Sequence, residues 1–269
     1  MASHIIDVSR HFQFDRAQLS QPVLGEARNL AERVRETNER IPDGWPVGYE
    51  RDLGRHLVPK RLGKTSDYDL GQIIPGFLTR SEKGLDKIDA RPETELCLHA
   101  LWTRPGAPPK ELKRPDLDFL AGRIGTTLRW REMRTAQTPS GHRILFTAVP
   151  DIERRLDAFL NHFNTPIAPR DALLGAVDSY LHFLLIHPFR DGNGFAARAL
   201  FQLFLNRHLG LRAPIFPIAP IYYRNLDLFQ YGYLSWTLRA DGDPLLGLFA
   251  RVIDSLDTFF LDEVAHDPV

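Results

Sequence analysis

The sequence predicts a mainly α-helical protein that carries one short β-hairpin. Apolar residues recur at helical spacing in several segments of 12 or more residues, roughly the length at which this spacing distinguishes helices from strands. Only one turn, at residues 138–141, is flanked by two short segments that fit strands. The chain contains neither a low-complexity tail nor a fixed-period repeat, so this is the fold class of a globular protein.

The N-terminal part of the chain predicts one helix and much irregular structure. Residues 19–40 place apolar side chains at helical spacing and end at the turn signal Pro42-Asp43-Gly44. Residues 44–76 are rich in glycine and proline and predict loops around short elements. A second helix is predicted over residues 93–102, before a linker or long loop in which proline removes backbone donors.

The middle of the chain predicts two helices separated by the hairpin. Residues 117–128 form the first helical pattern. Residues 134–137 and 143–147 lie on either side of the Thr138-Pro139-Ser140-Gly141 turn and predict the two strands. Pro150-Asp151 then opens a strongly periodic helix that continues to Phe163.

The next helices enclose the most informative segment of the chain. Residues 171–186 are apolar almost all round, which is typical of a helix buried at the centre of a bundle. Residues 187–194 interrupt the pattern, and a further helix is predicted over residues 195–208, ending at Gly210. Two more helical patterns follow at residues 225–239 and 244–260.

Composition excludes several classes of function. Lysine plus arginine and aspartate plus glutamate number 34 each, so no global field favours DNA or an anionic membrane. Cys97 is the only cysteine, which excludes an internal disulfide and a thiolate zinc site. Residues 1–16 lack the apolar core of a signal peptide, and no apolar run reaches membrane-spanning length. We therefore expect a cytoplasmic protein, or an effector delivered without a cleaved signal.

The segment between the two central helices contains the groups that are needed to handle a phosphate. Pro188 disfavours helix at His187, so the buried helix is expected to end there and hold the imidazole in a fixed place. Histidine is the usual general base for a hydroxyl nucleophile near neutral pH. Gly192 and Gly194 permit turns in which successive amides converge on an anion, at the N-terminus of the next helix.

Three polar side chains complete this arrangement. Asp191 offers a hard oxygen ligand for Mg²⁺, and Asn193 offers a neutral donor to a phosphate oxygen. Arg198, one helical turn further on, offers a permanently charged planar donor.

The segment from His187 to Arg198 resembles the signature of the Fic family, H-P-F-x-[DE]-G-N-G-x-x-x-R, and all of its fixed positions are present. The resemblance implies a helical bundle whose histidine deprotonates a serine, threonine or tyrosine hydroxyl of a target protein. The hydroxyl then attacks the α-phosphate of ATP, so that AMP is transferred and pyrophosphate leaves. It implies that His187 is the base and Asp191 the Mg²⁺ ligand. The nucleotide and its phosphates are then expected to contact Phe189, Gly192, Asn193, Gly194 and Arg198.

The surroundings of the signature also resemble the family. The predicted hairpin is similar to the family's flap, which binds an extended target segment by strand-like pairing; the expected docking residues are Arg134, Gln137, Gly141 and Ile144. Asn225 and Phe229 resemble the segment that lines the nucleobase pocket. We therefore predict a catalytic domain over residues 93–262, an N-terminal extension of mixed helix and loop over residues 1–92, and a tail over residues 263–269.

Two positions depart from the family pattern. Most members carry arginine directly after G-N-G, where this chain has Phe195, so the phosphate site lacks one positive charge. Other residues then hold the triphosphate, the donor differs, or activity is low. Autoinhibited members carry an [ST]-x-x-x-E-[GN] segment, and no serine or threonine here is followed four residues later by glutamate. Inhibition is then absent, supplied by a separate protein, or built into residues 1–92.

Two alternatives to AMP transfer stay open at this point. The same fold can transfer UMP, phosphate or phosphocholine, or it can serve as a catalytically silent nucleotide-binding or protein-binding module. His187 and Asp191 argue against the silent module, because binding alone needs no base. His182 lies on the buried-looking helix without a matching pair of metal ligands and is expected to be a core histidine. Neither the target protein nor the oligomeric state follows from the sequence.

Overall fold

The structure is a computed structural model, and it describes residues 5–7, 19–39, 110–128, 135–137, 143–211, 226–251 and 253–254. The helix predicted over residues 93–102 lies outside these ranges, as do the loops predicted around residues 44–76 and 105–109. The prediction of a mainly helical fold with one hairpin is confirmed.

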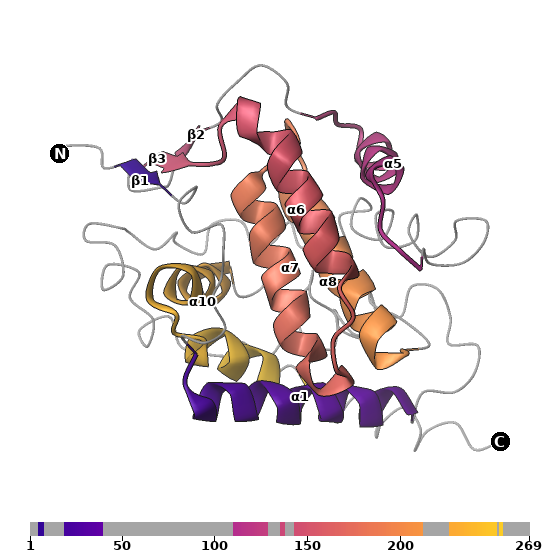
Figure 1. The fold of residues 1–269 in the computed structure, drawn as a ribbon. Coiled ribbons are helices and arrows are strands. Elements are labelled where there is room, and N and C mark those ends of the chain that lie inside the picture. Colours follow the sequence, from indigo (N-terminus) through magenta and orange to yellow (C-terminus); the bar gives the residue numbers. More distant parts are fainter. Residues whose placement is uncertain are drawn as a thin grey trace, which may run out of the picture.

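Three helices form the centre of the molecule: α6 (Ile152–Asn164), α7 (Ala172–Ile186) and α8 (Asn193–Leu209). They run side by side in Figure 1, and α7 packs most extensively against α8. Every residue of α7 except Leu184 is buried, as its apolar pattern predicts. A 3₁₀ turn at Val149–Asp151 (η5) precedes α6, so the helix begins just after the predicted Pro150 signal.

Close packing of α7 against α8 depends on a missing side chain. A Cβ atom added at Gly175 would lie 2.4 Å from Cε1 of Phe204. The Phe204 ring also packs edge-on against Phe163 of α6, with ring centroids 5.2 Å apart. The glycine therefore lets an aromatic ring of α8 reach the space between α7 and α6.

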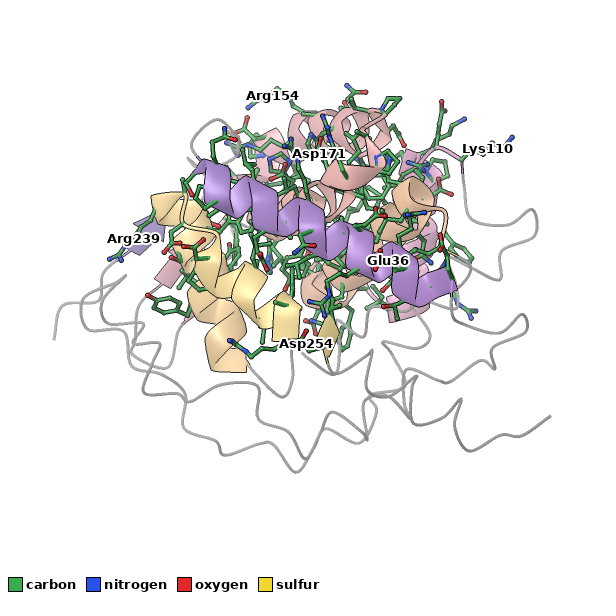
Figure 2. All side chains as sticks on the ribbon, turned by 90° about the horizontal axis from the view of Figure 1, so that it is seen from below. Glu36, Lys110, Arg154, Asp171, Arg239 and Asp254 are labelled. Carbon is green, nitrogen blue, oxygen red and sulfur yellow. The ribbon has the colours of Figure 1, made fainter. Side chains whose placement is uncertain are left out.

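Helix α1 (Gln21–Glu39) crosses the ends of the central helices and matches the helix predicted over residues 19–40. Its apolar side chains belong to the same hydrophobic core as those of α7. In Figure 2, Asp171 and Asp254 lie on opposite sides of this helix. Nε of Arg28 lies 2.8 Å from Asp171, and Arg33 forms an ion pair of 2.6 Å with Asp254. These ion pairs join α1 to residues on either side of it.

Helix α5 (Arg114–Ile124) is displaced from the predicted range of residues 117–128. Pro115 lies in its first turn, where a missing amide hydrogen is tolerated. Gly125 ends the helix with a left-handed φ of 77°, and its amide donates to carbonyl groups of the last turn. Pro115 and Gly125 therefore set the boundaries of α5, and the prediction from the apolar pattern alone was three to four residues too far toward the C-terminus.

The predicted hairpin consists of β2 (Thr135–Gln137) and β3 (Arg143–Leu145), which pair antiparallel with Ala136 opposite Ile144. A third strand, β1 (Ile5–Asp7), was not predicted and pairs parallel with β3. The strand order is therefore β1-β3-β2, with β3 in the middle. The sheet lies near the end of the bundle at which α7 finishes (Figure 1).

The last described helices also follow the predicted patterns. Helix α10 spans Leu226–Arg239, and residues 243–251 are helical at the start of the pattern predicted over residues 244–260. Within the described ranges, no helix combines the length and the apolar character that crossing a membrane requires.

One histidine makes stability depend on pH. Burial lowers the pKa of His208, in the last turn of α8, to about 4, and the neighbouring charge of Arg207 adds to this effect. In the unfolded chain His208 is protonated below about pH 6.5, whereas in the folded protein it is protonated only below about pH 4. The contribution of His208 to stability is fully present above about pH 6.5 and declines as the pH falls toward 4.

We expect His208→Phe to reduce this acid sensitivity, because phenylalanine cannot titrate and retains a ring against Phe204, whose centroid lies 4.3 Å from that of His208. The measurement is urea unfolding of both proteins at pH 7 and pH 5. The variant should lose less unfolding free energy than the wild type between the two pH values. Equal losses would show that His208 does not contribute.

Candidate active site

His187 lies directly after α7, at the position predicted for the end of the buried helix. Its amide donates to the carbonyl oxygen of Phe183 at 2.9 Å, which closes the last turn. Its backbone is left-handed, with φ 51° and ψ 54°, a conformation that few residues other than glycine and asparagine adopt. The imidazole is therefore attached to a rigid helix end, and the chain reverses direction immediately after it.

A ring from the flap lies flat against this imidazole. The centroids of Phe146 and His187 are 3.8 Å apart, and the ring planes differ by 13°. Phe146 directly follows β3 and is 7% exposed. The sequence pattern does not predict this contact, because the two residues lie 41 positions apart in the chain; the only local signal is an aromatic residue directly after the hairpin.

The loop after His187 is held from inside by Asn193. The Asn193 side chain accepts a hydrogen bond from the Phe189 amide at 2.8 Å and donates to the Phe189 carbonyl at 2.9 Å. The Phe189 ring is fully buried and packs edge-on against Phe183. Both side chains were expected to contact the nucleotide, but in this structure Phe189 fills the core and Asn193 fixes the loop.

The loop is held from outside by the segment after α5. The Arg190 amide donates to the Thr127 carbonyl at 3.0 Å, and the Asp191 amide donates to Oγ1 of Thr126 at 3.1 Å. Leu128 and Phe189 form an isolated antiparallel bridge. These contacts were not predicted, because a segment of three residues is too short to show a periodic pattern of apolar residues.

Gly192 and Asp191 form the turn into α8. Gly192 has φ 74° and caps the N-terminus of α8, as predicted, whereas Gly194 already belongs to the helix and does not have the positive φ that was expected of it. Oδ1 of Asp191 accepts the Gly192 amide at 2.8 Å, and the Asp191 residue is exposed. A carboxylate oriented by its own turn, at the surface of the site, suits a metal ion that also contacts a substrate.

The N-terminus of α8 provides amide donors beside this carboxylate. The Ala196 amide bonds back to the Gly192 carbonyl at 3.0 Å. The amides of Asn193, Gly194 and Phe195 precede this bond and belong to the first turn, where helical amides have no acceptor within the helix. The helix dipole adds positive potential at the same place, so the turn is suited to an anion.

Arg198 lies beneath this turn and is 2% exposed. Its guanidinium carbon lies 4.9 Å from the centroid of the Phe195 ring, in a cation–π contact. A Cβ atom added at Gly194 would lie 3.3 Å from Nη1 of Arg198. Phe195, directly after G-N-G, therefore contacts the arginine of the signature, Arg198.

The other predicted site residues are described only in part. The backbones of Gln137 and Ile144 belong to β2 and β3, and Ile144 packs against Phe146 and Leu185. The backbone of Phe229 belongs to α10, and the structure does not describe its side chain or that of Gln137. Arg134, Gly141 and Asn225 lie outside the described residues.

His182 is buried, as expected of a core histidine. Its ring packs edge-on against His162 of α6, with centroids 5.0 Å apart. Nε2 of His162 lies 3.9 Å from Oδ2 of Asp178, which is also buried. Even so, no group of three metal-ligating side chains suited to an ion occurs in the described part of the chain.

The sequence was compared with models of known protein families. Residues 118–205, from α5 through most of α8, match the model of the Fic/DOC family. This segment is a Fic domain. The match includes the hairpin, the loop after His187 and the whole signature, and it is narrower than the 93–262 range predicted for the catalytic domain, whose limits stay a prediction.

Comparisons with solved structures and with curated proteins do not indicate an activity. A solved structure of Fic-1 from C. elegans is similar to the chain at 16% sequence identity and a TM-score of 0.46, covering 90% of this chain and 72% of that one. That similarity is too low to indicate a shared activity. No curated protein matches the sequence.

Proposed function

We propose that this Fic domain transfers AMP from ATP to a serine, threonine or tyrosine hydroxyl of another protein. The observation that carries the proposal is the alignment of a histidine at a fixed helix end, a surface carboxylate and a helix N-terminus within one signature. Nucleotide binding alone would require the carboxylate and the helix N-terminus. The histidine is needed only if the site also catalyses a reaction. The proposal is that of a protein adenylyltransferase acting in the cytoplasm.

In the proposed reaction, His187 accepts the hydroxyl proton of the target as the oxygen attacks the α-phosphorus of ATP. A bond forms between the target oxygen and the α-phosphorus, and the bond to the bridging oxygen breaks, releasing pyrophosphate. The first amides of α8 and Arg198 stabilise the negative charge on the phosphates. Phe189 and Asn193 contribute by holding the loop in place.

The residues present fit a magnesium ion that is shared with the nucleotide. Mg²⁺ binds through one or two carboxylates, substrate phosphates and water rather than in a cage of protein ligands. Asp191 offers one such carboxylate. When bound, the ion would neutralise phosphate charge and orient the triphosphate beside the first turn of α8.

Asp191→Asn tests this assignment, because the amide keeps the size of the side chain and an acceptor for the Gly192 amide but weakens a hard-cation site. We expect half-maximal transfer to require more magnesium. A titration of activity against Mg²⁺ at saturating nucleotide measures the change. The same magnesium dependence in both proteins would refute Asp191 as the ligand.

The flap is proposed to bind the target as an added strand. Because β3 pairs on both sides, with β1 and with β2, the described part of the sheet presents the outer edges of β1 and β2 to a target segment. A separate inhibitory protein would act at the same surface or at the nucleotide. The proposal involves neither DNA nor a membrane.

A panel of donors tests the proposed function. Purified protein is incubated with labelled ATP, UTP, GTP or CDP-choline and a lysate, and the modified residue is located by mass spectrometry. Transfer from ATP that leaves AMP on a hydroxyl residue supports the proposal. Transfer from another donor supports the second candidate, a transferase of the same fold with a different substrate.

The second candidate is favoured by one observation, the phenylalanine at position 195. Phe195 packs partly against the core and faces Arg198, so the first turn of α8 presents an apolar ring where most Fic sequences have a charge. A donor with fewer negative charges than ATP, such as CDP-choline, would need less positive charge at this turn.

Phe195→Arg distinguishes the two donors. If ATP is the donor, a second arginine should raise its affinity about tenfold or more, because a charge-assisted hydrogen bond contributes about 1.5–3 kcal/mol. The unliganded variant should also melt at a lower temperature, because two guanidinium groups then lie close together. Calorimetric titration and thermal unfolding measure the two effects. Unchanged ATP affinity with loss of transfer from every nucleoside triphosphate would favour another donor.

A further inference from the structure

The strongest additional feature of the site is the flat contact between Phe146 and His187. Hydrogen bonds to an imidazole form in the plane of the ring, at Nδ1 and Nε2. A second ring that lies parallel at 3.8 Å touches only the face. It therefore fixes the plane in which the nitrogen atoms point without occupying either of them.

Phe146 is itself held on several sides. It forms a small hydrophobic cluster with Leu185, near the end of α7, and Ile144 and Tyr233 pack against this cluster. The next residue, Thr147, makes two bonds to the Leu185 carbonyl, from its amide at 3.3 Å and from its hydroxyl at 3.2 Å. The position of the ring is thus fixed relative to the same helix end that carries His187.

The same ring continues directly from the flap. Phe146 follows Leu145, the last residue of β3, which is the central strand of the sheet. A target segment that pairs with the sheet therefore rests on strands whose continuation contacts the base. Phe146 therefore connects the sheet to the His187 imidazole.

We infer that Phe146 is a positioning residue, which sets the orientation of the His187 imidazole and links it to the flap. The inference rests on the proposed function, because it deepens the role of His187 as base. Phe146 contacts neither nucleotide nor target in this account. Its effect reaches the reaction only through the plane and the position of the imidazole.

The test compares Phe146→Leu, Phe146→Tyr and the control Phe201→Leu. Phe201 is also buried but lies in α8 and packs against Tyr180 and Phe249 within the core. We expect Phe146→Leu to lower kcat about tenfold to a hundredfold, the range for a misplaced catalytic group, with the KM for the donor nearly unchanged. Phe146→Tyr retains the ring and should restore most of the rate. Phe201→Leu should lower stability and leave kcat unchanged.

An activity-independent readout accompanies the kinetics. In the wild type, the proton on Cε1 of His187 lies over an aromatic face and should resonate upfield, and its signal is assigned by its loss in His187→Asn. Phe146→Leu should move the signal downfield, and Phe201→Leu should not. A wild-type kcat or an unmoved signal in Phe146→Leu would overturn the inference. If the wild-type protein transfers nothing, the proposed function fails, while the signal still tests the stacking.

Discussion

His187→Asn is expected to lower transfer by about 10² to 10⁴, the usual consequence of losing a general base. Asparagine is the replacement of choice because His187 has a left-handed backbone, with φ 51°, which asparagine tolerates better than alanine. Its amide cannot accept a proton at neutral pH. Initial rates with saturating ATP and target measure the loss.

The fold of this variant should persist, because His187 follows the last residue of α7 and is only half-buried. Circular dichroism and thermal unfolding provide the control. A folded variant with nearly wild-type transfer would refute His187 as the base. A variant that binds ATP as well as the wild type but does not transfer it would separate chemistry from binding.

Among substitutions that add a single methyl group to the site, Gly192→Ala should lower stability and transfer the most. The added Cβ would lie 2.4 Å from Cγ2 of Ile124, and the residue has φ 74°. We expect a loss of about 1–3 kcal/mol from the collision, in addition to the backbone strain of about 1–2 kcal/mol. Displacement of the turn should also lower transfer about a hundredfold, because amides and Asp191 move with it.

Gly125→Ala is the matched control, because Gly125 has φ 77° and open space around the added Cβ. It should show the backbone strain alone and keep its activity. Combining Gly192→Ala with Ile124→Ala removes the colliding methyl group, so the double variant should recover the collision cost but not the strain. Equal destabilisation by Gly192→Ala and Gly125→Ala in urea unfolding would contradict the close approach of Ile124 and Gly192.

Local signals in the sequence predicted most of the described helices and the turn between α7 and α8. The apolar run before His187 and the proline after it end α7 where the structure ends it. Gly192 and Gly210 cap α8 with left-handed backbones. The predicted end at Gly210 is confirmed, whereas α8 begins at Asn193, two residues before the predicted start. These features depend on residues that are close in the sequence and can therefore be predicted without a structure.

Contacts between distant segments were not predictable in this way. The pairing of β1 with β3 involves three residues on each strand, too few for a periodic pattern. The stack of Phe146 on His187 and the approach of Ile124 to Gly192 each join segments that only the packed bundle brings together. Asn193 could be placed in the signature, but whether its amide faces a ligand or Phe189 depended on the folded loop.

The position of a label in ATP tests the central claim most directly. Attack at the α-phosphorus keeps the α-phosphate on the target and releases the β- and γ-phosphates as pyrophosphate. The wild-type protein, with Mg²⁺ and a target-containing lysate, should therefore incorporate label from ATP labelled at the α-phosphate and none from ATP labelled at the γ-phosphate, and His187→Asn should incorporate neither. Incorporation from the γ-phosphate, or equal incorporation by wild type and His187→Asn, would contradict the account.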